Sequence, residues 1–271
     1  MKNILVLLHD DAGQEARLQA ALDLTRALGG HLTGIDVCQA PAPVPGSIYG
    51  MVEADAMLLE DARAREQANI STVEQRLARE DVSWSMASMS GDLVDCIASQ
   101  VGLADLIVLN RRLDDFMAPD MLGVTSKLVL KVSRPIVAVQ EGLRSFDAAG
   151  TAIVAWDGSD AAAAALTASV PLLTLASSVV LVEVARSSSQ SVEAAATYLS
   201  RHFIRPQVDL VASKGESHDE VAELIQAACR RRNAAYCVMG AYGHSKVREL
   251  LFGGVTRTML KSSPVPLVIA H

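Results

Sequence analysis

The chain has 271 residues, of which 50% are hydrophobic and 20% are charged. This composition is typical of a globular protein with a sizeable core and excludes a disordered chain. The net charge of -7 argues against a general nucleic-acid binder, because phosphate binding requires clustered Lys and Arg.

Strands and helices are predicted to alternate along the whole chain. Short continuous apolar runs predict strands that are buried on both faces, and apolar residues at helical spacing predict helices. In the first half, strands are expected at 4–8, 32–37, 83–89, 104–109 and 135–139, and helices at 13–29, 52–80, 91–102 and 122–132. In the second half, strands are expected at 151–156, 177–184, 207–213, 235–239 and 265–270, and helices at 159–175, 189–203, 217–232 and 253–262.

The second half of the chain repeats the first. Residues 151–184 follow the pattern of residues 2–37, which places Asp10 opposite Asp157, and residues 253–270 align with residues 122–139. The repeat predicts the α/β class with two tandem, doubly wound domains at 1–141 and 149–271. Each is expected to be a five-stranded, Rossmann-like parallel sheet with strand order 3-2-1-4-5. Residues 140–150 have the composition of a linker.

No membrane span or export signal is predicted. The segment from Ala161 to Val182 is uncharged and about long enough to cross a bilayer. Its many small residues and Pro171 favour a buried helix followed by a strand, and the apolar run before Asp10 is too short for a signal peptide. The 4 cysteines show no zinc-site spacing, which favours reduced, mostly buried thiols in a cytoplasmic protein.

Residues 240–256, "GAYGHSKVRELLFGGVT", form a glycine-rich segment after the fourth predicted strand of the second half. Asp157 follows the first strand, so both features are expected at the point where the strand order reverses and such sheets bind ligands. Glycines let a phosphate approach backbone amides, and Gly253 and Gly254 precede a helix whose N-terminus attracts anions. The alternative is that the glycines only mark tight turns.

The charge distribution favours an anion in the second half. Residues 1–147 hold 13 Lys and Arg against 21 Asp and Glu, whereas residues 148–271 hold 11 against 10. The second half is therefore the less repulsive place for a phosphate.

The spacing G-x2-G-x9-G of Gly240, Gly243 and Gly253, followed by "GVT" and a final "PVPLVI" strand, resembles the nucleotide-binding signature of the universal stress protein family. The opening "VAWDGS" resembles that family's first strand and its Asp, and the resemblance covers the chain as a tandem pair. It implies a stress-response protein that binds ATP, AMP or ADP, with or without Mg2+, as a sensor or regulator. The family often has Ser or Thr at the position of Gly254. Because Gly254 has no hydroxyl, this chain lacks one contact that such members could make to a ligand.

The resemblance also implies which residues of the second domain hold the nucleotide. Asp157 would lie near the adenosine, the backbone of Val184 beside adenine, and the glycine loop around the phosphates. His244 lies in that loop, where it could touch a phosphate or face solvent. The expected set is Asp157, Gly158, Ser159, Val184, Gly240, Gly243, His244, Gly253, Gly254, Val255 and Thr256.

The first half departs from this signature. Leu109, Arg112 and Leu122 stand opposite the three spaced glycines, and only Gly123 is kept. The segment between them also carries Asp114, Asp115 and Asp120, which would repel a phosphate. The first half is therefore predicted not to bind ATP.

Enzymatic activity is not predicted by any motif. The chain has no P-loop, no nucleophile elbow and no H-E-x-x-H metal motif, so no catalytic residue and no metal ligand is assigned. Nucleotide binding is favoured over nucleotide hydrolysis. Two alternatives stay open: a slow ATPase that uses Asp157, and a scaffold that pairs without any nucleotide. The resemblance also implies that the two domains pair through their final strands, 135–139 and 266–270, whose edges would otherwise be open. A homodimer of the whole chain is left open, and no nucleic acid or membrane partner is expected.

Overall fold

The structure is a computed structural model of the chain. It describes residues 1–38, 52–115, 118–185, 192–212, 217–243 and 254–271, with the backbone alone at residues 52–63 and at Ala185.

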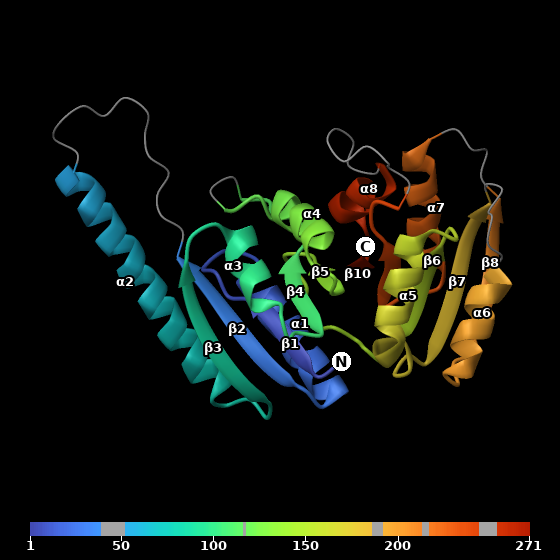
Figure 1. Cartoon of the computed structure of the whole chain (residues 1–271), viewed down its shortest axis with the longest axis horizontal. Helices are drawn as coiled ribbons and strands as arrows, with labels where there is room; N and C mark the ends of the chain where they lie inside the picture. Colours follow the sequence, from blue (N-terminus) through green and yellow to red (C-terminus); the bar gives the residue numbers. More distant parts are fainter. Residues whose placement is uncertain (39–51, 116–117, 186–191, 213–216, 244–253) are drawn as a thin grey trace.

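One sheet of ten strands runs through the molecule, as Figure 1 shows, in the order β3-β2-β1-β4-β5-β10-β9-β6-β7-β8. The first half of the chain supplies β1 (Asn3–Leu7), β2 (His31–Cys38), β3 (Ser83–Ser90), β4 (Leu106–Asn110) and β5 (Ile136–Val139). The second half supplies β6 (Thr151–Trp156), β7 (Ser178–Ala185), β8 (Gln207–Ala212), β9 (Tyr236–Gly240) and β10 (Leu267–Ala270). Each half therefore has the predicted strand order 3-2-1-4-5.

The two halves of the sheet join through their last strands. β5 and β10 pair antiparallel, with Val137 opposite Val268, whereas neighbouring strands within each half pair parallel. The predicted pairing through the final strands is confirmed. Neither final strand keeps an open edge, because each covers the edge of the other.

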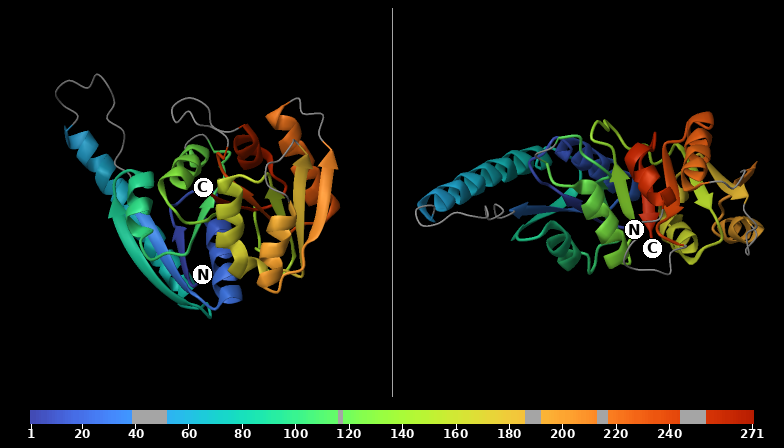
Figure 2. Two further views of the ribbon diagram at one scale, coloured as in Figure 1. Left: turned by 45° about the vertical axis from the view of Figure 1, so that its right-hand side comes forward. Right: turned by 90° about the horizontal axis from the view of Figure 1, so that it is seen from above.

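Helices cover both faces of the sheet in each half, as predicted (Figure 2). The first half has α1 (Gln14–Leu28), α2 (Val52–Leu77), α3 (Leu93–Gln100) and α4 (Met121–Lys131). The second half has α5 (Asp160–Leu173), α6 (Val192–Arg201), α7 (His218–Arg231) and α8 (Gly254–Ser262). One buried core lies under α1, α2, α5 and α6 and the other under α3, α4, α7 and α8, and each core includes residues of both halves.

The segment between the halves is anchored to the core. Phe146 is 4% exposed, its ring stacks on Tyr236 with centroids 5.4 Å apart, and its N–H donates to Asp23 Oδ2 at 2.8 Å. Ala148 is buried as well. Residues 140–150, whose composition is typical of a linker, thus pack between α1 and β9. The predicted domain limits, 1–141 and 149–271, stay a prediction.

Within the described ranges, no helix combines the length and apolarity that a membrane crossing requires. The uncharged segment from Ala161 to Val182 forms most of α5 and the start of β7, as predicted, with Pro171 inside the last turns of α5. All four cysteines are free thiols, and only Cys38 is not buried.

Candidate functional site

Asp157 and Ser159 form the turn from β6 into α5. Asp157 Oδ1 accepts hydrogen bonds from the Ser159 backbone N–H at 3.0 Å and from its hydroxyl at 2.7 Å. The Ser159 hydroxyl in turn accepts from Ala162 N at 3.1 Å and caps the helix. Gly158 has a φ of 73°, a conformation that favours glycine. This turn holds the exposed Asp157 carboxylate at the C-terminal end of β6.

At Gly240 and Gly243 there is no room for a side chain. A Cβ on Gly240 would lie 2.6 Å from the carbonyl carbon of Ala161, and a Cβ on Gly243 would lie 2.7 Å from Ser159 Oγ. Neither glycine has a positive φ. The two glycines let the segment after β9 pass directly against the N-terminus of α5, with Gly240 beside Ala161 and Ala162 and Gly243 beside Ser159.

The remaining described candidates lie around the same strand ends. Val184 follows Glu183, which is opposite Trp156 in the sheet, so Val184 is beside Asp157. Thr256 is buried, and its hydroxyl accepts from Tyr242 N at 3.3 Å.

The first residues of α8 pack tightly. A Cβ on Gly254 would lie 2.6 Å from His218 Cβ, so Gly254 is needed where α8 meets α7, and the half-buried Val255 packs against the core. His244 and Gly253 lie outside the described residues.

The sheet register corrects the sequence alignment of the two halves. Asn110 is opposite Val139 as Gly240 is opposite Ala270, so Asn110 and not Leu109 corresponds to Gly240. By the same register Leu113, not Arg112, corresponds to Gly243.

The turn into the first helix needs a similar correction. Asp11 Oδ1 accepts from Gly13 N at 2.8 Å, as Asp157 does from Ser159, and Gly13 and Ser159 are the N-cap residues of α1 and α5. Asp11, not Asp10, is therefore the counterpart of Asp157. A gapless alignment misses this because the connection from β1 to α1 is longer than the connection from β6 to α5.

In both halves the segment after the fourth strand packs closely against the cap of the first helix. The glycine that makes room lies on the helix in the first half and after the strand in the second. In the first half, the helix cap is Gly13, and a Cβ there would lie 2.5 Å from Leu113 Cδ2 and would also clash with Asn110. In the second half the cap is Ser159, and the glycines lie on the strand side. In each half, side chains larger than hydrogen are therefore found either at the helix cap or after the strand, but not on both sides of the contact.

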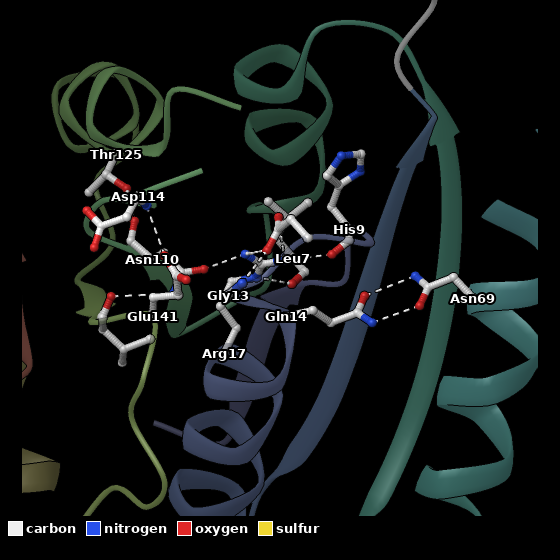
Figure 3. Close-up of polar contacts among 12 residues, drawn as sticks. Leu7, His9, Gly13, Gln14, Arg17, Asn69, Asn110, Asp114, Thr125 and Glu141 are labelled. Carbon is white, nitrogen blue, oxygen red and sulfur yellow. Dashed lines mark hydrogen bonds and ion pairs between the residues drawn. The ribbon is translucent and has the colours of Figure 1, made fainter. Parts of the chain in front are cut away.

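Arg17 fills the crevice of the first half (Figure 3). Its side chain is fully buried, its Nε donates to Leu7 O at 2.8 Å, and an Nη donates to His9 O at 2.9 Å. It also pairs with Asp11 Oδ1 at 2.9 Å and donates to Asn110 Oδ1. Burial lowers the pKa of Arg17, and the Asp11 carboxylate opposes that effect. Arg17 could not be recognised from the sequence, because one Arg in an amphipathic helix gives no signal of burial.

Comparison of sequences gives no match: neither a protein-family model nor a curated protein matches the chain. Solved structures do match along its whole length. A universal stress protein from Archaeoglobus fulgidus DSM 4304 covers 98% of this chain and 97% of its own, at a TM-score of 0.71 and 14% identity. A Pseudomonas aeruginosa UCBPP-PA14 protein assigned to the universal stress proteins covers 100% of this chain and 93% of its own, at a TM-score of 0.61 and 15% identity.

The chain has the universal stress protein fold. The resemblance that the glycine spacing and "VAWDGS" carried is confirmed at the level of the fold, over both halves of the chain. A functionally unknown protein from Pseudomonas aeruginosa PAO1 also has this arrangement, with a TM-score of 0.61, 15% identity, and coverage of 100% of this chain and 92% of its own.

The two halves of this universal stress protein fold differ at the helix that follows the crevice. In the first half Asp120 caps α4, with its Oδ1 accepting from Gly123 N at 3.0 Å, so a carboxylate already occupies the end of the helix that attracts anions. Leu251 aligns with Asp120 in the sequence repeat. The second half therefore lacks an acidic residue at the aligned position.

The threonines of the repeated "GVT" have matching roles in the fold. The Thr125 hydroxyl donates to Asn110 O at 2.9 Å, and the Thr256 hydroxyl bonds the segment after β9. Both tie the helix to the strand end. In the part of the chain that the structure describes, no three His, Cys, Asp or Glu side chains are placed to hold a metal ion.

Proposed function

We propose that the second half binds an adenine nucleotide, ATP or its mono- or diphosphate, and acts as a nucleotide-dependent regulator in a stress response in the cytoplasm. The fold that the chain shares with universal stress proteins supports the stress-response role. The crevice at the ends of β6 and β9 supports the ligand, because Asp157, Gly240, Gly243 and the first residues of α8 meet there at the point where the strand order reverses.

The observation that carries the proposal is the difference between the two crevices. The first half fills its crevice with the side chains of Arg17 and Asn110. Counted from the helix caps Gly13 and Ser159, the counterpart of Arg17 is Ala163, and the counterpart of Asn110 is Gly240. The second half thus has small residues where the first half has polar side chains that bond to each other.

The described residues suit the parts of a nucleotide. The exposed Asp157 carboxylate can accept a hydrogen bond from a ribose hydroxyl, and the backbone at Val184 lies beside it. Phosphates would lie between Gly243 and the start of α8, where helix N–H groups and the partial positive charge favour an anion. Mg2+ would arrive bound to the phosphates.

The glycines themselves are poor positions for a test. Because Gly243 contacts Ser159, a Gly243→Val change would disturb the start of α5 even without a ligand. Asp157→Asn is better, because Asn keeps the Oδ1 acceptor for Ser159 and loses only the charge and the second acceptor. Leu251→Asp is a second variant, since it places an acidic residue at the position that aligns in the sequence with Asp120.

Calorimetric titration of the full chain with ATP and with adenosine tests the proposal. We expect saturable ATP binding that Asp157→Asn weakens about tenfold, the cost of one charge-assisted hydrogen bond. Leu251→Asp should weaken ATP binding and spare adenosine. Glu193→Gln, which removes a charge from α6, should change neither. Absence of ATP binding, or equal binding by Asp157→Asn and Glu193→Gln, would refute the proposal.

A further inference from the structure

A pocket of about 330 Å³ lies in the first half, between α2 and the C-terminal ends of β2 and β3. Arg17, Asp11 and Asn110 are not among its described lining residues. Asp36 and Cys38 of β2, Ser88 and Ser90 of β3, and Glu66 and Ile70 of α2 line it. Its volume is at the lower end of the range for small-molecule sites.

Two carboxyl groups in this pocket, those of Asp36 and Glu66, interact with each other, and within the described residues one oxygen of each receives no N–H or O–H from any other residue. Asp36 is 2% exposed, and its Oδ1 is buried. Glu66 Oε1 is buried and has no hydrogen bond from a donor of another residue, and its neighbour His9 Nδ1 lies 3.8 Å away, beyond hydrogen-bond reach. Buried polar atoms in proteins are normally paired, and the proton that the two carboxyl groups share is the only donor that the described residues supply to these oxygens.

We propose that this pocket binds a small organic ammonium ion, which donates hydrogen bonds to Asp36 Oδ1 and Glu66 Oε1. An ammonium group has three N–H donors and no acceptor, so it satisfies both oxygens and neutralises the charge that burial penalises. Ile70 offers an apolar surface to the carbon part of the ligand, and the Ser88 and Ser90 hydroxyls offer polar contacts at the rim.

The composition of the pocket favours an organic cation over a metal ion. Within the described residues no three metal-ligating side chains come together, and a divalent ion such as Mg2+ would need more oxygens than the carboxyl pair supplies. The excess of acidic residues in the first half, 21 against 13 basic residues over 1–147, also attracts a cation.

Binding of the cation should release a proton. Burial first, and then the hydrogen bond and charge of Glu66, raise the pKa of Asp36 to about 8, so the pair shares a proton at neutral pH. Glu66 from α2, His9 from the end of β1 and Cys38 from β2 are the other described titratable groups around it, and the lining residues of β3 contribute none. A bound ammonium favours the ionised form of Asp36 and displaces its proton.

Calorimetric titration of the full chain with n-butylammonium, in two buffers that differ in ionisation enthalpy, tests this site. We expect saturable binding with proton release, weakened about tenfold or more by Asp36→Asn and by Glu66→Gln. Glu74→Gln removes the same charge from an exposed position of α2 and should leave binding unchanged. Circular dichroism and thermal melts check that each variant is folded.

Three results would overturn the proposal. The first is the absence of saturable binding of n-butylammonium by the folded wild-type chain. The second is equal binding of 1-butanol, which would make the pocket merely apolar. The third is tighter binding of Mg2+ that the same two variants abolish, which would make it a metal site.

Discussion

At the scale of single residues, the sequence shows only part of the role of the glycines in this chain. The sequence predicted that Gly240 and Gly243 lie at a ligand crevice, and the structure places both against the first residues of α5 and its cap, where they allow close packing. A glycine chosen for space and one chosen for a ligand look the same in one sequence. The packing role is thus compatible with the nucleotide proposal but does not depend on it.

A matched pair of glycines measures this packing role. Gly240→Ala should lower the free energy of unfolding by about 1 to 3 kcal/mol, because the new Cβ would overlap Ala161 and Ala162 at the start of α5. Gly102→Ala, where a Cβ meets nothing within 4 Å, should change it by less than about 0.5 kcal/mol. Urea denaturation of both variants is the measurement, and equal effects would contradict the packing role.

Asp36 should make stability depend on pH. Its pKa is raised to about 8 in the folded chain, chiefly by burial, and is about 4 in the unfolded chain. The folded state therefore holds a proton that the unfolded state has lost, and this stabilisation is complete below pH about 4 and is lost as the pH rises through about 8.

Asp36→Asn should accordingly flatten the pH dependence. Between pH about 5 and 7, the free energy of unfolding of the wild type should fall more steeply than that of the variant by about 1.4 kcal/mol per pH unit, the effect of one proton. Denaturant unfolding across this range measures both slopes, with Glu74→Gln as a control that keeps the wild-type slope. Parallel curves for Asp36→Asn and the wild type would show that Asp36 ionises normally.

At the scale of elements, the sequence predicted every strand and helix within a few residues, because periodicity and end signals agree. Gly29 ends α1 in the left-handed conformation, and Ser217 caps α7 by accepting from Glu220 N; both residue types are common at these helix ends. The fine alignment of the halves could not be predicted, because a longer connection before α1 shifts Asp11 against Asp10. The burial of Arg17 could not be predicted either, because it depends on partners that are distant in the sequence, such as Asn110.

Helix α8 connects the proposed nucleotide site with the first half. Arg111, which follows β4, donates to Leu260 O in the last turn of α8 at 3.2 Å, where a cation also favours the helix dipole. At its other end, the Thr256 hydroxyl bonds the segment after β9. A shift of α8 on nucleotide binding would therefore reach the first half through Arg111.

Two adjacent arginines test this connection. Arg111→Ala should lower the free energy of unfolding by about 1 to 2 kcal/mol, because it removes the hydrogen bond and the charge at the end of α8. Arg112→Ala removes an exposed partner of Asp114 and should cost less than about 0.5 kcal/mol. Thermal and urea unfolding compare the two variants. If Arg112→Ala is the more damaging change, Arg111 does not hold α8.

At the scale of the whole molecule, the tandem repeat predicted both halves and their pairing, because two open final strands of similar sequence need a cover. The continuous sheet and the two cores that include residues of both halves follow from that pairing. What the repeat could not predict is how the halves diverge. Arg17 is buried beside the strand ends of the first half and Asp120 caps α4, whereas Ala163 follows the α5 cap at the same interval as Arg17 follows the α1 cap, and Leu251 aligns with Asp120 in the sequence.

Hydrogen exchange of the full chain, with and without saturating ATP, tests the central proposal most directly, because it reports each half separately. We predict slower exchange at the backbone amides of residues 157–162, 240–243 and 254–256, and no change at residues 9–17 and 120–125. Protection of residues 9–17 or 120–125, or no protection in the second half, would contradict the assignment of the nucleotide to the second half.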